Sequence, residues 1–471
     1  MLLINFAGEH IFFPINLFSS LIAYKLDSKN KLYKTLKSKY FIYGEQDELN
    51  TAVSLLSNQI RTKQRYLQDF TSLHMIEVTN YCNLQCDYCQ ASTVTLEEAK
   101  IKKDNNLKKN ILNKTLDIIF DSPSNSIKIE LQGGEPLVNW NSCKYIIENA
   151  HARGQLLKNK NVEIIVCTNL LLVDEEKLAF LKKYNVHIST SLDGNKELHD
   201  KHRTSYSGNP SYEKFIEKLA LTRKILGHNS VGALLTVTKS NLYHLKDVVD
   251  EYIRLGFNGL FIRALNPYGM ATRNLEELGY TVEEFIQEYK KTLAYIIEQN
   301  KKGHLFADYY TQLLFKRIMS PFSTGFMDLQ SPAGAGISGA IYDFNGNVYP
   351  TDEGRMIARM GDERFKIGNV LTDSYEKIFT NPKLINITKK SILFTTPSCS
   401  NCIFNPYCGS DPIRNFVESS DIVGHKPSSD FCKKNKLLFK HLFNLLEKND
   451  QDTLDILWSW ATKRPLREVR I

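Results

Sequence analysis

Cysteines are the residues of this chain best suited to chemistry, and the 471 residues include nine of them. Seven of the nine form two tight groups, namely Cys82, Cys86 and Cys89, then Cys399, Cys402, Cys408 and Cys432. In a reducing compartment such clustering favours metal or redox chemistry over disulfide bonds. The remaining two, Cys143 and Cys167, are expected to be buried structural thiols.

The first group, T-N-Y-C-N-L-Q-C-D-Y-C, follows a predicted strand and spaces its cysteines x3 and then x2. A structural zinc ion normally takes four ligands, and His74, eight residues before Cys82, is a doubtful fourth one. Three thiolates on a short loop instead suit a four-iron cluster with one iron left open. The spacing therefore favours an iron–sulfur cluster, with zinc as the alternative.

C-N-L-Q-C-D-Y-C resembles the signature of the radical S-adenosylmethionine (SAM) enzymes, and Gln132-Gly133-Gly134-Glu135-Pro136 is similar to their G-G-E-P motif. Alone, G-G-E-P is equally consistent with a turn. The resemblance implies that SAM chelates the open iron of a 4Fe–4S cluster and that a 5′-deoxyadenosyl radical abstracts a substrate hydrogen. The two glycines let the backbone approach the ligand, and Glu135 can accept from the methionyl ammonium.

The resemblance also implies SAM contacts at later strand ends. Those expected are Thr168, Asn169, Ser191 and Asp193 for the ribose and carboxylate, Arg203 for the SAM carboxylate, and Tyr88 for the adenine. Each is also consistent with a helix cap, a surface residue or, for Tyr88, simple packing.

The second group, with spacing x2, x5 and x23, is similar to the SPASM extension of radical SAM enzymes that modify peptides and proteins. Typical members hold two auxiliary four-iron clusters, but Ala333, Thr351 and Pro412 stand where the cluster nearer the active site has cysteines. The resemblance thus implies one auxiliary 4Fe–4S cluster on the four C-terminal cysteines, with zinc as the alternative. Asp352 stands where related sulfatase-maturing enzymes have a candidate base, and a turn aspartate is the other interpretation.

Strand and helix patterns alternate from His74 onward, which predicts a parallel sheet. The predicted strands are Met75–Thr79, Ile127–Leu131, Val162–Thr168, Val186–Leu192, Ala233–Thr238 and Gly259–Leu265. The predicted helices between and after them include Leu107–Asp121, Glu175–Tyr184, Leu245–Leu255, Val282–Asn300 and Phe306–Ile318. In such folds chemistry collects at the C-terminal strand ends, where the motifs lie.

The flanking segments predict smaller units. Before the sheet we expect a hairpin over Leu2–Pro14, helices near Leu17–Leu26, Leu32–Lys37 and Leu49–Tyr66, and a strand at Tyr40–Tyr43. After it we expect a hairpin turning at Asn345-Gly346 and closing helices at Lys433–Lys448 and Thr453–Trp460. The first 70 residues fit a winged-helix-like unit that binds a leader peptide by strand addition, or else a cap on the barrel.

The fold class is thus α/β, a partial (β/α)6 TIM-like radical SAM barrel with a winged-helix-like N-terminal unit and a SPASM-like iron–sulfur domain. The expected division is 1–70 for peptide recognition, 71–270 for the barrel, 271–330 for a helical linker, 331–445 for the auxiliary cluster and 446–471 for a C-terminal helix and tail.

Composition excludes other classes. Sixty Lys and Arg against 52 Asp and Glu give a mild net charge of +8 without an arginine-rich, aromatic-interleaved block, so nucleic acid is not the expected partner. No apolar run has transmembrane length, and Met1–Tyr24 does not have the pattern of a signal peptide. A cytoplasmic protein without a membrane partner is expected.

Over nearly the full chain, segments such as I-N-F-A-G-E-H-I-F-F-P, D-L-Q-S-P-A-G-A-G and V-G-H-K-P-S-S-D-F-C resemble the His-Xaa-Ser system radical SAM maturases of the HxsB type. The resemblance implies an oxidoreductase that forms a cross-link or an oxidised residue in a ribosomally made peptide with a leader. Implied partners are an electron donor such as flavodoxin or ferredoxin, a small companion protein and a second radical SAM protein. The alternatives are a radical SAM enzyme acting on a nucleic acid or small metabolite, and a non-catalytic scaffold stabilised by zinc.

Overall fold

The computed structural model describes residues 1–44, 46–99, 105–157 and 159–469. The chain forms two compact units, each built from separate stretches of sequence. The barrel unit comprises 69–310 and 334–389, and the terminal unit comprises 1–68, 311–333 and 390–471. The five-part division expected from sequence groups the chain differently, because it joins 334–389 to the C-terminal cysteines.

The barrel unit is organised around a ten-stranded sheet with the order β11-β10-β9-β8-β7-β6-β3-β12-β13-β14. Its six central strands are β3 (Leu73–Thr79), β6 (Ser126–Gly133), β7 (Asn161–Cys167), β8 (His187–Ser191), β9 (Val231–Thr236) and β10 (Gly259–Arg263). All six are parallel neighbours, as the alternation of strands and helices predicts. The fold of this unit is thus mixed α/β, and every one of the predicted strands is confirmed.

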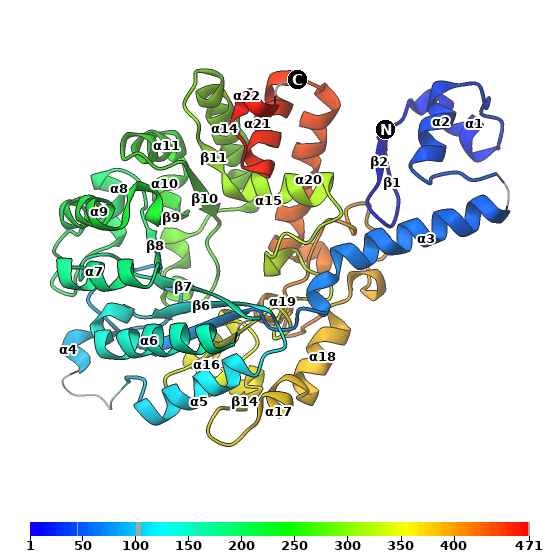
Figure 1. Ribbon diagram of the computed structural model, residues 1–471. Helices are drawn as coiled ribbons and strands as arrows, with labels where there is room; N and C mark the ends of the chain where they lie inside the picture. The colour runs from blue at the N-terminus through cyan, green and yellow to red at the C-terminus, as the bar shows by residue number, and fades with distance from the viewer. Residues whose placement is uncertain (45, 100–104, 158, 470–471) are drawn as a thin grey trace. The chain divides into compact units, whose positions relative to one another are not determined.

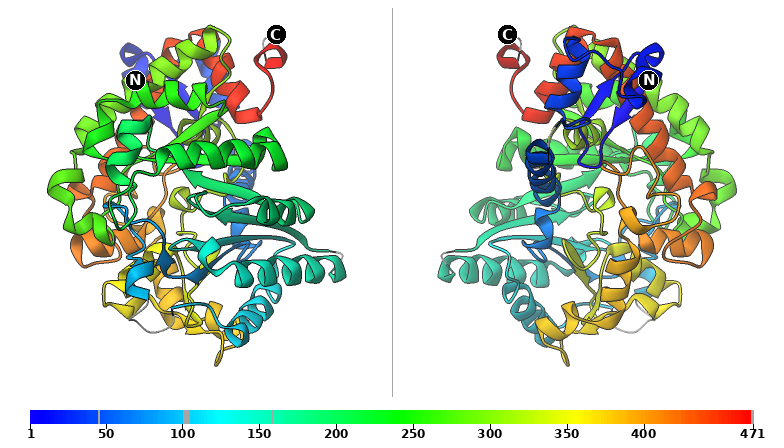
Figure 2. Two further views of the ribbon diagram at one scale, coloured as in Figure 1. Left: turned by 90° about the vertical axis from the view of Figure 1, so that its left-hand side faces the viewer. Right: turned by 90° about the vertical axis from the view of Figure 1, so that its right-hand side faces the viewer.

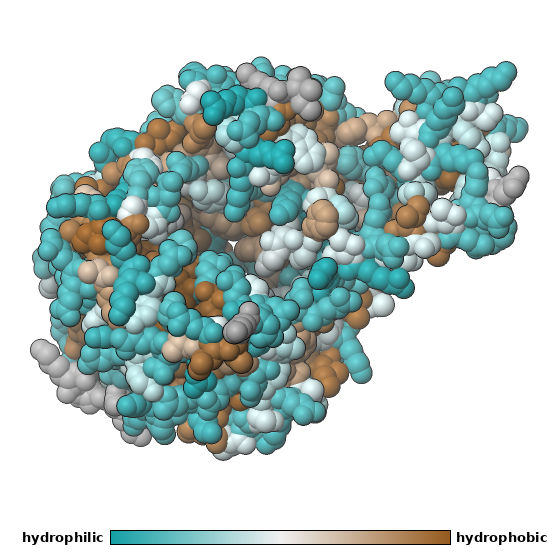
Figure 3. Space-filling view, in the orientation of Figure 1, coloured by the Kyte–Doolittle hydropathy of each residue, from teal (hydrophilic) through white to brown (hydrophobic). Residues whose placement is uncertain are grey.

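Helices follow the strands and lie outside the curved sheet in the barrel unit (Figures 1 and 2). They are α5 (Lys109–Phe120), α6 (Trp140–Leu156), α7 (Glu175–Lys183), α8 (Lys196–His202), α9 (Tyr212–Leu226), α10 (Lys239–Leu242), α11 (Leu245–Arg254), α12 (Met270–Arg273), α13 (Leu275–Leu278) and α14 (Val282–Lys301). Their apolar residues recur at helical spacing, so one face packs on the sheet and the other is polar. The space-filling view accordingly shows a mostly hydrophilic surface over these helices, with smaller hydrophobic patches (Figure 3).

A late segment of the chain extends the sheet beyond β3. Strand β12 (Gly339–Tyr342) pairs in parallel with β3, and β13 (Asn347–Tyr349) folds back antiparallel on β12 through the predicted Asn345-Gly346 turn. Gly346 has a φ of +83°, a conformation that glycine adopts without steric cost. The late segment also contains β14 (Gly368–Asn369), α16 (Asp352–Arg359), α17 (Tyr375–Phe379) and α18 (Pro382–Lys390). At the opposite edge of the sheet, β11 (Ala307–Asp308) pairs in parallel with β10.

The N-terminal part of the terminal unit contains the predicted hairpin, with β1 (Leu2–Ile4) antiparallel to β2 (His10–Phe12). Helices α1 (Phe18–Ile22), α2 (Lys31–Ser38) and α3 (Gln46–Lys63) follow, near their expected positions. The strand expected at Tyr40–Tyr43 is wrong: this segment is irregular and begins with Tyr40 at a φ of +58°. A residue in that left-handed conformation cannot continue an extended strand.

The C-terminal part of the terminal unit is helical around the second cysteine group. Its helices are α15 (Tyr309–Met319, which begins at the unit boundary), α19 (Pro412–Ser419), α20 (Asp430–Lys448), α21 (Gln451–Thr462) and α22 (Leu466–Val469). Tyr407 ties this part to the hairpin, because its hydroxyl donates to the Gly8 carbonyl at 2.7 Å. None of the helices in the described ranges is both long and apolar enough to cross a membrane.

Candidate functional site

A cavity of about 400 Å³ in the barrel unit gathers most of the predicted site residues. Those that line it are Cys82, Cys86, Tyr88, Cys89, Gln132, Gly133, Gly134, Thr168, Asn169, Ser191, Arg203 and Asp352. They come from the first cysteine loop, the ends of β6, β7 and β8, the C-terminal end of α8, and helix α16. The rule that chemistry collects at the C-terminal strand ends therefore holds here.

The cysteine loop leaves the end of β3 and carries all three thiols toward the cavity. Burial raises the pKa of Cys82 well above its usual value and the pKa of Cys86 to about 12. Both groups are therefore neutral thiols when no metal is bound, and they would release protons on binding one. All three are free of disulfide bonds, as metal ligands must be.

Polar contacts from several elements fix the shape of this loop. The Asn169 side chain donates to Asn83 Oδ1 at 2.8 Å, which joins the loop to the end of β7. The Gln85 amide donates to the Thr204 carbonyl at 2.8 Å, and the Asn274 side chain donates to the Asp87 carbonyl at 2.9 Å. The loop is therefore held by residues of three other segments of the barrel unit.

The two glycines after β6 allow the chain to pass close to the cysteine loop. A Cβ on Gly134 would lie 2.3 Å from the Tyr81 carbonyl oxygen, and one on Gly133 would lie 2.2 Å from that of Thr79. Both contacts are with backbone atoms, which cannot swing away as a side chain can. The glycines are thus required for packing inside the protein as well as for access of a ligand.

Glu135 does not line the cavity, which differs from the expected contact with a methionyl ammonium. Its carboxylate is buried and already accepts hydrogen bonds from the amides of Leu137 and Asn169 and from the Thr168 hydroxyl, at 2.8–3.0 Å. Burial raises its pKa to about 7 against these three bonds, which lower it. Glu135 therefore braces the ends of β6 and β7, while its neighbour Pro136 begins a short 3-10 helix behind them.

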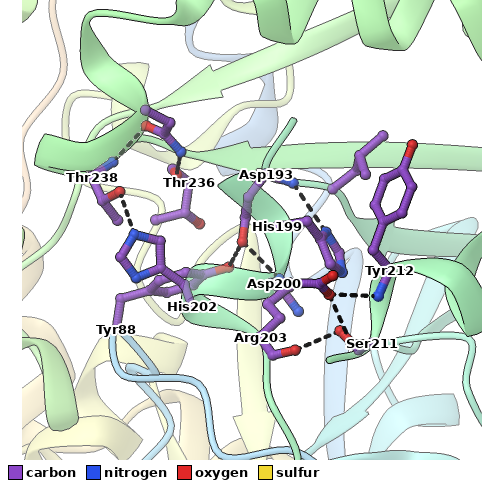
Figure 4. A network of polar contacts seen from close by, with 12 residues as sticks. Tyr88, Asp193, His199, Asp200, His202, Arg203, Ser211, Tyr212, Thr236 and Thr238 are labelled. Atoms are coloured by element: carbon purple, nitrogen blue, oxygen red, sulfur yellow. Dashed lines mark hydrogen bonds and ion pairs between the residues drawn. The ribbon is translucent and has the colours of Figure 1, made fainter. Parts of the chain in front are cut away.

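Tyr88 of the cysteine loop forms a buried network with Asp193 and Arg203 (Figure 4). One oxygen of Asp193 accepts from the Tyr88 hydroxyl at 2.5 Å and from Arg203 Nε at 2.9 Å. Asp193 is fully buried and does not line the cavity, and its expected contact with the ligand stays a prediction. Asp193 orients Tyr88 and Arg203, which do face the cavity.

Sequence reasoning missed several polar groups in the cavity wall. Glu130 precedes Gln132 on the same face of β6 and lines the cavity, where burial raises its pKa. Arg263 at the end of β10 also lines it. Cys167 does too, so the expectation of a buried structural thiol is wrong for Cys167 but confirmed for Cys143. The period-two spacing from Gln132 and Asn169 was the signal that could have found Glu130 and Cys167.

The second cysteine group lines a separate, smaller cavity of about 30 Å³ in the terminal unit. All four predicted cysteines face it, together with Phe431, Phe439, Lys426 and Lys436 among others. The Asn435 side chain donates to Cys408 Sγ at 3.7 Å, and burial raises the pKa of Cys408 to about 12. Loop and helix residues from 399 to 432 therefore face one small cavity.

In neither cavity do the described residues place three His, Cys, Asp or Glu side chains close enough together to hold a single metal ion. The three loop thiols nonetheless line one cavity and the four C-terminal thiols another. Free thiols, donor side chains near the sulfurs and a glycine approach fit the chemistry of cluster ligands.

Comparison with known proteins identifies the barrel. Residues 76–252 match the sequence model of the radical SAM superfamily. This domain belongs to the radical SAM superfamily. The radical SAM domain carries the cysteine loop, the two glycines and the ends of β6 to β8, and membership of the superfamily implies SAM and a 4Fe–4S cluster.

Proteins similar over most of the chain include a maturase and two proteins whose structures were solved with a bound peptide. A cysteine-type anaerobic sulfatase-maturating enzyme of Clostridium novyi is 25% identical over 375 residues, covering 76% of this chain and 91% of that one. The structure of anSMEcpe with bound AdoMet and a peptide has a TM-score of 0.65 at 19% identity, covering 80% and 98% of the two chains. SuiB of Streptococcus suis bound to its precursor peptide SuiA has a TM-score of 0.55 at 14% identity, covering 92% and 96%. These solved structures show the same fold.

Proposed function

We propose that this radical SAM protein modifies a ribosomally made peptide or protein. The observation that carries the proposal is the single cavity onto which three thiols, two glycines and the ends of three parallel strands all face. The relatedness to a sulfatase-maturating enzyme and the fold shared with peptide-bound SuiB support a polypeptide substrate. The whole-chain resemblance favours a His-Xaa-Ser-repeat peptide.

The residues of the first site have separate tasks in this proposal. Cys82, Cys86 and Cys89 would hold a 4Fe–4S cluster, and three protein ligands would leave a place on it for SAM. When bound, the cluster and SAM would supply the radical chemistry that removes a hydrogen atom from the substrate. Arg203 and Tyr88, held by Asp193, bind parts of SAM at the cluster side of the cavity.

The protein completes the reaction from the other walls of the cavity. Thr168, Asn169 and Ser191 offer hydroxyl and amide groups for the polar parts of SAM. Asp352 offers a carboxylate to the substrate and accepts the proton lost as a cross-link or an oxidised residue forms, while the electron left on the substrate radical would pass to a bound 4Fe–4S cluster.

The terminal unit has two proposed roles. Cys399, Cys402, Cys408 and Cys432 hold one auxiliary 4Fe–4S cluster, and the hydrogen bond from Asn435 to Cys408 is of the kind that supports cluster sulfurs. Strands β1 and β2 pair only with one another among the described residues, so each has an edge to which a leader peptide can add. A flavodoxin or ferredoxin supplies electrons, and a companion protein and second radical SAM protein complete the expected set of partners.

Metal content is the first test. Anaerobically purified protein should contain about eight iron and eight sulfide ions per chain and no zinc. A Cys432→Ala variant should retain about four irons, because only the C-terminal site loses a ligand. About four irons with one zinc in the wild type would leave the radical chemistry in place but reduce the C-terminal site to a structural role.

Product formation is the second test. With a reductant, SAM and a His-Xaa-Ser-repeat peptide carrying its leader, the wild type should release 5′-deoxyadenosine and lower the peptide mass by about two hydrogens per event. Cys86→Ala should abolish both, and the matched control Cys143→Ala, in a buried thiol outside the cavity, should not. A gain of one methyl group would contradict the cross-link, and salt-sensitive RNA retention would favour the nucleic-acid alternative. Full function of Cys86→Ala without SAM would favour the scaffold.

A further inference from the structure

Arg355 in helix α16 is one of the most deeply buried arginines of the barrel unit, with 1% of its side chain exposed. Its Nε and Nη2 atoms donate to the same oxygen, Oδ1 of Asp352, at 2.9 and 2.6 Å. Its Nη1 atom donates to Oε1 of Glu77 at 2.7 Å. All three nitrogens are thus used, which fixes the plane and direction of the guanidinium.

Glu77 holds Arg355 from the central sheet. It lies on β3, its side chain has no exposed surface, and its second oxygen accepts from Arg359 Nη2 at 2.6 Å. Arg359 also lies 3.6 Å from Asp343 Oδ2 at the end of β12. Because β3 and β12 are paired in register, both anchoring carboxylates belong to one rigid surface.

Asp352 stands at the cavity end of this chain of contacts. It lines the cavity and keeps 21% of its side chain exposed. Both bonds from Arg355 go to Oδ1, and among the described residues no donor is bonded to Oδ2. The arginine therefore immobilises the carboxylate while leaving one oxygen for a ligand.

We propose that Arg355, itself held by Glu77, is a positioning residue that aims the Oδ2 atom of Asp352 into the cavity as a hydrogen-bond acceptor for the substrate. The proposal rests on the function proposed above, because it needs a substrate at Asp352. The free oxygen distinguishes this arrangement from a buried ion pair with only a structural role. Such a pair can often be replaced by apolar residues without loss of stability, and it has no need of an oxygen that faces a cavity.

Structures of two variants test the positioning directly and need no substrate. In Arg355→Met the Asp352 carboxylate should turn away from the cavity, and in Arg355→Lys it should stay, because an ammonium keeps one donor on Oδ1. Iron content equal to that of the wild type would show that both variants are folded. A carboxylate that keeps its position in Arg355→Met would overturn the proposal.

Kinetics test the consequence for the reaction. With the His-Xaa-Ser-repeat peptide, Arg355→Met should lower the rate of peptide modification about 100-fold, since misplacement of a reacting group by about 1 Å has effects of this size. Arg355→Lys should modify the peptide about tenfold faster than Arg355→Met does. SAM cleavage without peptide should change less than about twofold, because the cysteine loop and SAM contacts are intact.

Arg364→Met is the matched control, because Arg364 is an exposed arginine paired with Asp362. It should leave all rates unchanged. Equal peptide modification by Arg355→Met and wild type would overturn the proposal. A wild type that modifies no peptide would refute the proposed function instead, while the variant structures would still decide whether Arg355 positions Asp352.

Discussion

The carboxylate of Glu135 accepts a hydrogen bond from the hydroxyl of Thr168, 2.8 Å away on the neighbouring strand end. The other Glu135 oxygen accepts from the amide of Asn169 at the same distance. Two parallel strands are therefore joined behind the cavity by an acidic group whose motif predicts a ligand contact. Because Glu135 directly follows the two glycines, these bonds fix Thr168 and Asn169, which do line the cavity, relative to the glycine motif.

Removing this hydroxyl should destabilise the strand ends. Thr168→Val keeps the shape of the side chain but leaves the buried Glu135 with two donors, so the free energy of unfolding should fall by about 1–2 kcal/mol. The loss should be larger at pH 8 than at pH 6, because Glu135 has a pKa of about 7 and a bond to the ionised form is stronger. Urea denaturation measures both values.

Thr190→Val is the control for this substitution. Thr190 on β8 is also buried, but its hydroxyl has no hydrogen-bond partner among the residues that the structure describes. Its replacement should therefore be neutral or slightly stabilising. Equal decreases in the free energy of unfolding of the two variants would show that the bond to Glu135 does not contribute to stability.

Adding a single methyl group at Gly134 should disrupt the cysteine loop. The new Cβ would meet the Tyr81 carbonyl oxygen at 2.3 Å, so Gly134→Ala should cost about 3 kcal/mol or more and lower the iron content of the first site. Gly232→Ala on β9 meets nothing within 4 Å and should change stability by less than about 1 kcal/mol. Thermal unfolding and iron analysis of both variants check the contrast. A Gly134→Ala protein with full iron and wild-type stability would contradict the packing seen here.

The Tyr88 hydroxyl should matter for SAM affinity and not for cluster assembly. Without it, the fully buried Asp193 keeps only its bond to Arg203, and the arginine is less well fixed. Tyr88→Phe should weaken SAM binding about five- to tenfold, which corresponds to about 1–1.4 kcal/mol. Equilibrium dialysis with SAM measures this change at constant iron content. Tyr243→Phe, which removes an exposed hydroxyl bonded to Glu284, should leave affinity unchanged.

Acid should weaken the barrel through His74. This fully buried imidazole lies between the Tyr342 hydroxyl and the Thr71 carbonyl, and burial lowers its pKa to about 3. In the unfolded chain histidine takes up a proton near pH 6.5, so the stability due to neutral His74 is complete above that pH and is lost as the pH falls. Between pH 7.5 and 5.5 the loss should be about 1.4 kcal/mol.

His74→Gln isolates this contribution. Glutamine retains a donor and an acceptor but does not titrate, so its free energy of unfolding should fall by about 1.4 kcal/mol less than that of the wild type over the same interval. Urea denaturation at the two pH values gives the comparison. Parallel pH profiles for the two proteins would show that His74 is not the group responsible.

The central fold could be predicted because local signals and tertiary structure agree in the barrel unit. Runs such as Ile127–Leu131 are buried strands flanked by amphipathic helices, and both patterns are visible within a dozen residues. The partnership of β12 with β3 was not predictable in this way. It joins residues 266 positions apart in the sequence, such as His74 and Ala340, and an isolated hairpin pattern does not specify a third, parallel partner.

The motifs predict which segments form the candidate site, but they do not predict which of their polar side chains face the cavity. Sequence places Glu135 and Asp193 beside cavity residues, yet neither lines the cavity. Both oxygens of Glu135 are bonded, and so is Oδ2 of Asp193. Which of two neighbouring polar residues faces a cavity depends on strand register and on donors from other strands. Arg355 was missed because its partners, Glu77 and Asp352, are distant from one another in sequence.

The late position of β12 also bears on the order in which the protein is made. Translation yields the cysteine loop, the glycines and all six central strands before the segment 339–359 leaves the ribosome. Until then the nascent chain has an unpaired β3 edge and lacks the Asp352 wall altogether. A product truncated after residue 310 would keep Cys82, Cys86 and Cys89 but lack Asp352. The thiols proposed to hold the cluster and the carboxylate proposed to face the substrate are therefore encoded in separable parts of one gene.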